Sequence, residues 1–262
     1  MRRKKKRRVP IILIVALFLC LGMVIFCGSQ LAGIFLEYKE GTDEYDELRK
    51  YVEQEVPDVS YNEGDSPGEG EEAEVREQRI AFEELKAQNE DVIGWIEIPD
   101  TEISYPLMQG DDDQYYLKHT FSGNKNSAGS IFVEALNKAD FSERHTIIYG
   151  HNMKNGSMFG GLKEYRNASY LVDHPTIYID LEDGTHAYAI FSCYETAANS
   201  DTYTIGFASQ PDGQYERFLQ TIKGRSAYDT GIEVSKNDRV ITLSTCTKSG
   251  EKRFVVHGKR VY

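Results

Sequence analysis

Cysteine is scarce in this chain, with four in 262 residues. Cys20 and Cys27 lie within a long apolar segment near the N-terminus, so only Cys193 and Cys246 remain in the polar part of the chain. A small secreted domain that is held together by disulfides needs more paired cysteines than this. We therefore expect a fold built on a hydrophobic core. Cys193 stands within the apolar run AYAIFSCYE, which predicts a buried strand residue.

The sequence also lacks the patterns that hold metals or cofactors. Five of the six histidines show no metal-ligand spacing, and we expect each of them at the surface or in a hydrogen bond: His119, His145, His174, His186 and His257. Three adjacent carboxylates in GDDDQ (110–114) lack the alternating ligands of a calcium loop and instead predict the start of a helix. The glycines of GMVIFCG and MFGG form no phosphate-binding motif. We expect no metal and no cofactor.

Positive charge is concentrated at the N-terminus and scarce afterwards. Seven of the 30 Lys and Arg residues stand between Arg2 and Arg8, which leaves 23 against 42 Asp and Glu residues. The rest of the chain is therefore strongly acidic, and nucleic acid is not an expected partner.

A long uncharged run follows the basic residues and extends from Val9 to Leu36. Its core from Val9 to Cys27 contains 19 residues, which make a helix of roughly 28 Å and can cross a bilayer. A cleaved signal peptide is the alternative, with a weak cleavage site near residues 31–33. Because a signal peptide has a shorter apolar region, we favour an uncleaved anchor. The flanking charge predicts that the basic end stays in the cytoplasm.

Composition divides the chain into four regions. We expect residues 1–8 to be a basic cytoplasmic tail and residues 9–36 a membrane helix. Residues 37–80 are expected to be an extracellular spacer, in which a charged helical stalk is followed by a flexible acidic linker at 57–72. Residues 81–262 are long enough for one soluble domain with a substantial core.

The last region is predicted to be mainly β with helices. An amphipathic helix is expected from Ala73, in EVREQRIAFEELKAQN, with its packed side formed by Val75, Ile80, Phe82 and Leu85. Eight apolar runs separated by turn-rich loops then predict a closed eight-stranded barrel: GWIEI, ISYPLMQ, SIFVE, HTIIYG, TIYIDL, HAYAIFSCYET, DRVITLSTC and KRFVVHGKRVY. Helical insertions are expected near residues 158–165 and 214–223. The second lies in the long loop before the strand that contains Cys246.

The last 25 residues, 238–262, predict two strands joined by a short loop around Gly250. Cys246 ends the first strand and Arg253 opens the second, so we expect the two residues to be neighbours. A guanidinium group favours a thiolate and carries fixed donors for a carbonyl oxygen or an oxyanion.

His151 follows an apolar strand that breaks at Gly150, so it stands at a strand exit as Cys246 does. A thiolate and an imidazole brought together can transfer an acyl group, because the thiolate attacks a carbonyl and the imidazolium protonates the leaving amine. Residue type alone favours another interpretation, in which Cys246 is a small buried hydrophobe and His151 a hydrogen-bonded loop residue.

Strand alternation separates Arg253 from the neighbouring Lys252. Arg253 shares one face of its strand with Val255 and His257, whereas Lys252 shares the other with Phe254 and Val256. Phe254 and Val256 suit a barrel interior, which places Arg253 on the outer face.

The segments TLSTC and KRFVVHGKR, with YGHNM upstream, resemble the signature of the sortases, the membrane-anchored cysteine transpeptidases of Gram-positive bacteria. Further segments resemble class B sortases in order: NEDVIGWIEIPDTEISYPLMQ, DDQYYLKHTF, GSIFVE and MFGGLKEY. The resemblance covers about Phe82 to Tyr262 and implies the sortase-type barrel. It also implies that Cys246 is the nucleophile, His151 the proton carrier and Arg253 the group that steadies substrate and oxyanion.

The resemblance further implies a substrate groove, formed by Leu117, Tyr203, Thr204, Ser244 and Thr245. Asp113 stands near a position where some relatives carry an amide, and the loop between Cys246 and Arg253 is shorter than in some members of the class.

The implied activity is cleavage of a C-terminal sorting signal after a threonine, followed by transfer of the new carboxyl end through a Cys thioester to a cell-wall amine. The expected partners are surface proteins that carry the sorting signal, the amine of a peptidoglycan precursor, and the membrane through the N-terminal helix. The enzyme is expected to be a single-pass type II protein with its catalytic domain outside the cell. Two alternatives stay open: a pilin-polymerising sortase, and a non-catalytic module that binds sorting signals.

Overall fold

The computed structural model describes residues 11–54, 78–246 and 252–261. The basic tail at 1–8, the acidic linker at 57–72 and the turn at Gly250 lie outside these ranges.

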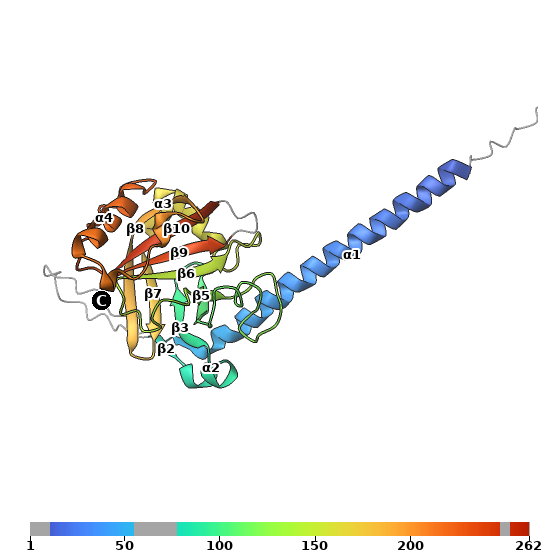
Figure 1. Cartoon of the computed structure of the whole chain (residues 1–262). Coiled ribbons are helices and arrows are strands. Elements are labelled where there is room, and N and C mark those ends of the chain that lie inside the picture. The colour runs from blue at the N-terminus through green and yellow to red at the C-terminus, as the bar shows by residue number, and fades with distance from the viewer. Residues whose placement is uncertain (1–10, 55–77, 247–251, 262) are drawn as a thin grey trace, which may run out of the picture.

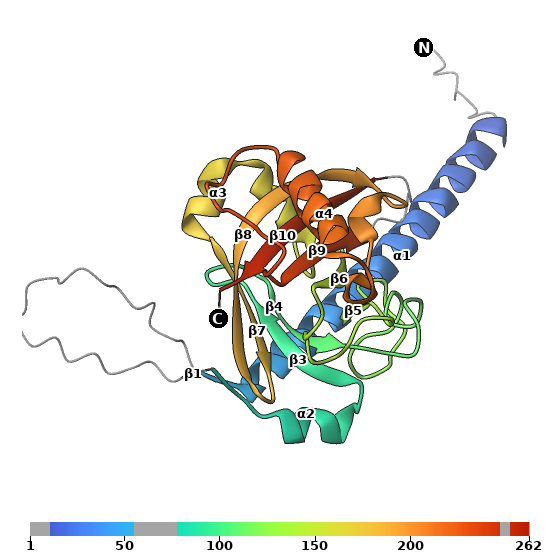
Figure 2. The same ribbon diagram turned by 60° about the vertical axis from the view of Figure 1, so that its left-hand side comes forward.

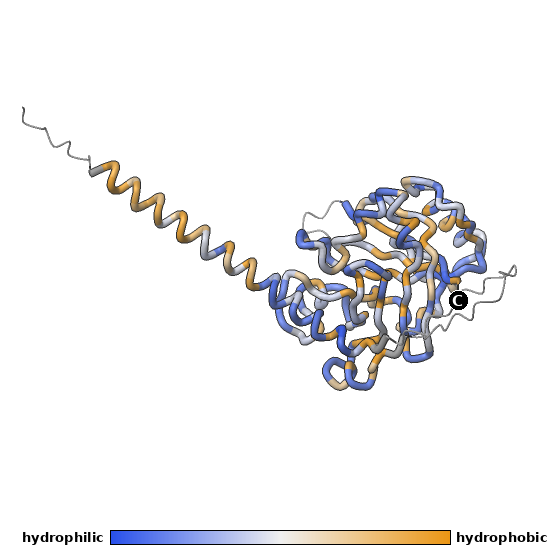
Figure 3. The backbone as a smooth tube through the Cα atoms, turned by 180° about the vertical axis from the view of Figure 1, so that it is seen from behind, coloured by the Kyte–Doolittle hydropathy of each residue, from blue (hydrophilic) through white to orange (hydrophobic). Residues whose placement is uncertain are grey.

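A single continuous helix, α1 (Ile11–Leu48), opens the described chain and projects from the rest of the molecule as a long arm (Figure 1). Its large apolar side chains from Ile12 to Leu36 are exposed, and the helix is long and apolar enough to cross a membrane. The hydropathy along the helix changes where it reaches the barrel (Figure 3). There Tyr45 and Leu48 are buried, so the stalk predicted after Leu36 is helical but packs on the barrel.

Short elements connect α1 to the barrel. A 3₁₀ turn, η1 (Arg49–Tyr51), leads into β1 (Val52–Gln54), which pairs antiparallel with β2 (Gln78–Ile80). The helix α2 (Phe82–Gln88) follows, with Leu85 buried as predicted. The prediction of a helix through residues 78–81 was wrong, because pairing with β1 gives this backbone other hydrogen-bond partners. Residues 73–77 lie outside the described ranges.

The eight predicted strands close into a barrel: β3 (Val92–Glu97), β4 (Ser104–Met108), β5 (Ile131–Val133), β6 (His145–His151), β7 (Thr176–Leu181), β8 (Gly184–Ala197), β9 (Val240–Cys246) and β10 (Lys252–Arg260). The order around the barrel is β10-β8-β7-β3-β4-β5-β6-β9. Two neighbouring pairs, β4 with β5 and β6 with β9, are parallel. The predicted fold is confirmed, and the closed barrel leaves no free sheet edge among these strands.

Helices and 3₁₀ turns occupy the connections: η2 (Gly160–Arg166), α3 (Ala168–Asp173), η3 (Asp201–Tyr203), η4 (Phe207–Ser209) and α4 (Asp212–Gly224). α4 lies in the long connection before β9, as predicted, and covers the outer face of β8, β9 and β10 (Figure 2). The predicted helix start in residues 110–114 was wrong. This segment forms bends, because the Asp112 carboxylate accepts the amides of Gln114 and Tyr115 in a local turn.

The two faces of β10 belong to different hydrophobic clusters. Phe254 and Val256 pack in the barrel interior, whereas Val255 packs outside with the side chains of α4. Cys193 is fully buried in the interior cluster. The predicted alternation of β10 and the buried strand position of Cys193 are both confirmed.

Candidate active site

The parallel pairing of β6 with β9 brings the ends of two distant segments together. The register runs from His145 opposite Val240 to His151 opposite Cys246, which is the last residue of β9. Neighbouring strands lie about 4.8 Å apart. The structure therefore puts the backbones of His151 and Cys246 side by side at one end of the barrel.

Arg253 opens the neighbouring strand β10. The pairing of β10 with β9 is antiparallel and sets Val255 opposite Ser244. The same register continued by two residues sets Arg253 opposite Cys246. Arg253 is half-buried, and its Nη1 donates to the Lys252 carbonyl at 3.4 Å. His151, Cys246 and Arg253 thus stand on three adjacent strands at the same end of the barrel.

Lys252 has a different environment from Arg253. The Lys252 side chain is 79% exposed, and its Nζ lies 3.7 Å from a carboxylate oxygen of Glu195. Glu195 is also paired with Arg166. The hydrogen bond from Arg166 and the two nearby positive charges lower the pKa of Glu195. Lys252 therefore belongs to a surface ion-pair group on the opposite face of β10.

The imidazole of His151 is held by a loop outside the strands. Its Nε2 donates to the carbonyl oxygen of Leu117 at 2.7 Å. In the neutral ring this hydrogen bond fixes the proton on Nε2 and leaves the lone pair on Nδ1. Gly150, just before His151, has no room for a side chain, because a Cβ would stand 2.4 Å from the Cδ1 of Ile131 and 2.7 Å from the ring of Phe159. The exit of β6 thus depends on glycine.

Four of the predicted groove residues make hydrogen bonds near the ends of β6 and β9: Leu117 through its backbone carbonyl, and Tyr203, Ser244 and Thr245 through their hydroxyls. Tyr203 contacts β9 directly, with its hydroxyl 2.9 Å from the Oγ of Ser244. Ser244 and Thr245 are both buried, and the Thr245 Oγ1 accepts the amide of Phe254 at 2.9 Å. Leu117 contributes the carbonyl described above. The two β9 hydroxyls therefore tie the strand to its neighbours instead of facing solvent.

A polar group beside Tyr203 was not predicted from the sequence. The ring of Tyr149 stacks on Tyr203 with centroids 6.3 Å apart, and its hydroxyl donates to Glu134 at 2.8 Å. Burial and a hydrogen bond with Asp113 raise the pKa of Glu134. Asp113 also accepts the amide of Ala135 at 2.8 Å. The sequence did offer a sign of this group, because Glu134 and Tyr149 stand at the polar ends of two apolar runs, IFVE and TIIYGH.

Comparison with known proteins agrees with the resemblance. The sortase domain family matches residues 96–261. Sortase B of Listeria monocytogenes serovar 1/2a (strain ATCC BAA-679 / EGD-e) is 36% identical over 244 residues, which cover 92% of this chain and 93% of that protein. The chain belongs to the class B sortases.

Solved structures of this family share the fold. The crystal structure of sortase B from B. anthracis in complex with AAEK1 matches with a TM-score of 0.71 and 34% identity, and the match covers 87% of this chain and 99% of that one. The Staphylococcus aureus sortase B–substrate complex matches with a TM-score of 0.66 and 32% identity over 69% of this chain and 84% of that one. The predicted family, enzyme class and barrel are therefore confirmed: this is a sortase cysteine transpeptidase, and the family acts on surface proteins.

A buried row of hydrogen bonds links the long loop of this sortase to β9 and β10. The carbonyl of Thr204 accepts from the Nδ1 of His145 at 2.7 Å, and the Nε2 of His145 lies 2.6 Å from the Oγ1 of Thr242. The same Oγ1 lies 2.8 Å from the Nδ1 of His257. We call these four residues the histidine row. Burial lowers the pKa of His145 to about 4 and also lowers that of His257.

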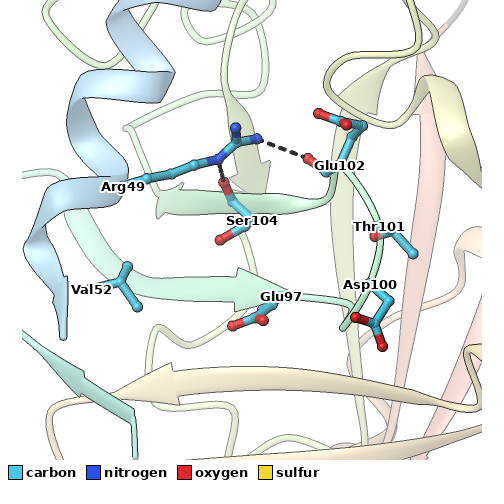
Figure 4. A pocket seen from close by; sticks show the side chains of 7 residues that line it. All are labelled: Arg49, Val52, Glu97, Asp100, Thr101, Glu102 and Ser104. Atoms are coloured by element: carbon cyan, nitrogen blue, oxygen red, sulfur yellow. Dashed lines mark hydrogen bonds between the residues drawn. The ribbon is translucent and has the colours of Figure 1, made fainter. Parts of the chain in front are cut away.

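A separate pocket of about 540 Å³ lies beside η1 (Figure 4) and is lined by Arg49, Val52, Glu97, Asp100, Thr101, Glu102 and Ser104. Arg49 donates to the carbonyls of Glu102 and Ser104 across it. None of the predicted site residues lines this pocket. The parts of the chain that the structure describes contain no group of three His, Cys, Asp or Glu side chains that could hold a metal.

Proposed function

We propose that this sortase cleaves a C-terminal sorting signal after a threonine and transfers the new carboxyl end to an amine of a cell-wall precursor through a thioester on Cys246. The register of β6 and β9, with His151 opposite Cys246, carries this proposal. Arg253 at the start of β10 supplies the third group.

In the first step the Cys246 thiolate attacks the carbonyl carbon of the threonine, which is the acyl carbon of the scissile bond. The electron pair of the carbonyl moves onto oxygen, and the fixed N–H donors of Arg253 stabilise the oxyanion. When the oxyanion collapses, the C–N bond breaks and the His151 imidazolium gives its proton to the departing amine. The product is a thioester and a released peptide.

In the second step the acceptor amine attacks the thioester carbonyl. His151, now neutral, takes the proton from the attacking nitrogen, and the C–S bond breaks to regenerate the thiolate. One amide bond is broken and another is formed, so the free energy of the acyl group is conserved and no external energy source is needed.

The Leu117 carbonyl has a specific part in this scheme. Because Nε2 of His151 donates to it at 2.7 Å, Nδ1 is the ring nitrogen that exchanges the proton with the thiol and the amine. The same carbonyl stabilises the imidazolium form that the first step requires. The proposed groove for the sorting peptide includes Leu117 and Tyr203, and the Tyr203 hydroxyl lies 2.9 Å from Ser244 on β9. Thr204 follows Tyr203 in the chain, but its carbonyl accepts from His145, at the opposite end of β6 from His151.

The N-terminal helix is proposed to anchor the enzyme with the barrel outside the cell. Residues 1–8 would remain in the cytoplasm, 9–36 would cross the bilayer, 37–80 would lie outside it, and 81–262 would form the catalytic domain. The basic residues at the start and the exposed apolar surface of α1 support this type II orientation. Residues 37–48 pack on the barrel, so the folded unit also includes the end of α1.

A cleavage assay with a library of threonine-containing sorting peptides tests the activity. The full chain in detergent should release the peptide that follows the threonine, and an added primary amine should appear on the new carboxyl end. Cys246→Ala should do neither while its circular dichroism spectrum stays that of the wild type. Cleavage by the alanine variant would exclude Cys246 as the nucleophile.

A further inference from the structure

The Leu117 carbonyl, which accepts the hydrogen bond of His151, packs against Gly129. Both residues lie in the connection between β4 and β5. Gly129 has a φ of +58°, and a Cβ on it would stand 2.5 Å from the carbonyl oxygen of Tyr116 and 3.0 Å from that of Leu117. The backbone of Gly129 is therefore packed against the carbonyl group to which Nε2 of His151 donates. A shift of Gly129 would move the Leu117 carbonyl, since no space separates them.

The end of α1 holds this glycine. The hydroxyl of Tyr45 donates to the carbonyl of Gly129 at 2.6 Å and lies 3.1 Å from the Oγ of Ser130. Tyr45 is only 3% exposed, so this hydrogen bond has no competition from bulk water. The helix that leaves the membrane segment thus contacts the support of His151 through a single intervening residue.

Two carboxylates of α1 bind backbone amides of the same β4–β5 connection at two further points. Glu37 accepts the amide of Ser127 at 2.7 Å, and Glu44 accepts the amide of Ser122 at 2.8 Å. Amide-to-carboxylate hydrogen bonds are stronger than neutral ones. Together with Tyr45 they define the position of α1 relative to the loop.

Tyr45 also reaches the chain on the other side of His151. Its ring packs edge-on against Tyr105 with centroids 5.3 Å apart. The hydroxyl of Tyr105 accepts the amide of Met158 at 2.9 Å, and Met158 forms a β-bridge with Asn152, the residue after His151. One tyrosine of α1 therefore contacts both the loop that binds the imidazole and a side chain that holds the segment after His151.

We propose that Tyr45, with Glu37, is a positioning residue of the active site: the end of the anchor helix sets the Leu117 carbonyl and thereby the orientation of His151. The proposal rests on the proposed function, in which His151 carries the proton. It makes the last turns of α1 part of the catalytic apparatus in addition to the membrane attachment.

The test compares two tyrosine variants in the full chain in detergent. Tyr45→Phe keeps the ring and removes the hydrogen bond to Gly129. Tyr215→Phe is the matched control, because Tyr215 is fully buried and its hydroxyl also donates to backbone carbonyls, those of Arg144 at 2.7 Å and Asp238 at 2.9 Å. These two partners lie at the opposite end of β6 and β9 from His151.

We expect Tyr45→Phe to lower kcat for peptide cleavage about tenfold, with KM unchanged, because a small displacement of a proton carrier lowers the rate of the chemical step. The pH profile of kcat should differ from that of the wild type, because the variant disturbs the hydrogen bond between the imidazole and the Leu117 carbonyl. Tyr215→Phe should keep the wild-type kcat and pH profile. A wild-type kcat and profile for Tyr45→Phe, or an equal defect in Tyr215→Phe, would overturn the proposal.

A second pair of variants extends the kinetic test, and a spectroscopic measurement provides a result that does not depend on the substrate. Glu37→Ala should reproduce the defect, and Glu37→Gln, which keeps an acceptor oxygen for the Ser127 amide, should restore most of the rate. The ¹⁵N chemical shift of His151 Nε2 should change in Tyr45→Phe and stay unchanged in Tyr215→Phe, with no peptide present. An unchanged Nε2 signal in Tyr45→Phe refutes the positioning role, whereas failure of the wild type to cleave any peptide refutes only the proposed function.

Discussion

Acid should destabilise this sortase through the histidine row, because both of its imidazoles are fully buried. A carbonyl can only accept, so Nδ1 of His145 donates to Thr204, and Nε2 of His145 accepts from the Thr242 hydroxyl. The oxygen of Thr242 then accepts from Nδ1 of His257. A proton added to Nε2 of His145 would place a positive charge in a fully buried site with no carboxylate in the row to offset it. The row is therefore stable only with neutral imidazoles.

The size of this effect follows from the pKa of His145. Burial lowers that pKa to about 4, whereas an unfolded histidine titrates near 6.5. Between these values the unfolded chain binds a proton that the folded protein does not, so the free energy of unfolding falls as pH decreases. The full loss is about 3 kcal/mol, of which about 2 kcal/mol is lost between pH 7.5 and pH 5. His257 contributes with the same sign, since burial lowers its pKa too.

Urea denaturation of the full chain in detergent at pH 7.5, 6 and 5 measures this loss. Trp95 is the one tryptophan of the chain and is fully buried, so its fluorescence follows unfolding. His145→Gln should be less stable than the wild type at pH 7.5 but should lose about 2 kcal/mol less on going to pH 5. Thr242→Val keeps the buried imidazole of His145 and should keep most of the acid sensitivity. A His145→Gln variant with the full wild-type acid sensitivity would refute the reasoning.

Two further predictions concern the catalytic cation and the orientation in the membrane. Arg253→Lys should lower single-turnover acylation on the order of 10²-fold or more, because it keeps the charge and loses the fork of donors. Lys252→Ala should cost little, since Lys252 is exposed and pairs with Glu195; a larger defect at Lys252 would identify the wrong cation. In wall-stripped intact cells, added protease should cleave the linker within residues 64–70. Cleavage there only after lysis would reverse the proposed orientation.

The barrel could be predicted from the sequence because each strand carries its own local signal. The runs of β6 and β9 are apolar, end at polar residues and are bounded by turn residues, and both were located correctly. Their parallel pairing leaves no such signal, since residues 145–151 and 240–246 meet only through the closure of the barrel. The proximity of Cys246 and His151 was therefore predicted from the sortase resemblance and from shared chemistry, and no periodicity could have supplied it.

The errors and omissions arose where tertiary contacts override local pattern. Residues 78–80 have a helical pattern but pair with β1. The charged stalk after Leu36 was interpreted as part of a spacer, although Tyr45 and Leu48, three residues apart on one face of a helix, are buried against the barrel. The support of His151 by Leu117 is a backbone contact, and the side-chain pattern of the loop gives no sign of it.

The measurement that tests the central claim most directly is the mass of the intact enzyme after brief mixing with a cleavable sorting peptide. The proposed mechanism predicts an added mass equal to the peptide acid that ends at the threonine, less one water. The adduct should be located on Cys246 by peptide mapping and released by hydroxylamine, as a thioester requires. His151→Ala should form this adduct far more slowly. Cleavage without any adduct on Cys246, or an adduct on another residue, would contradict the mechanism.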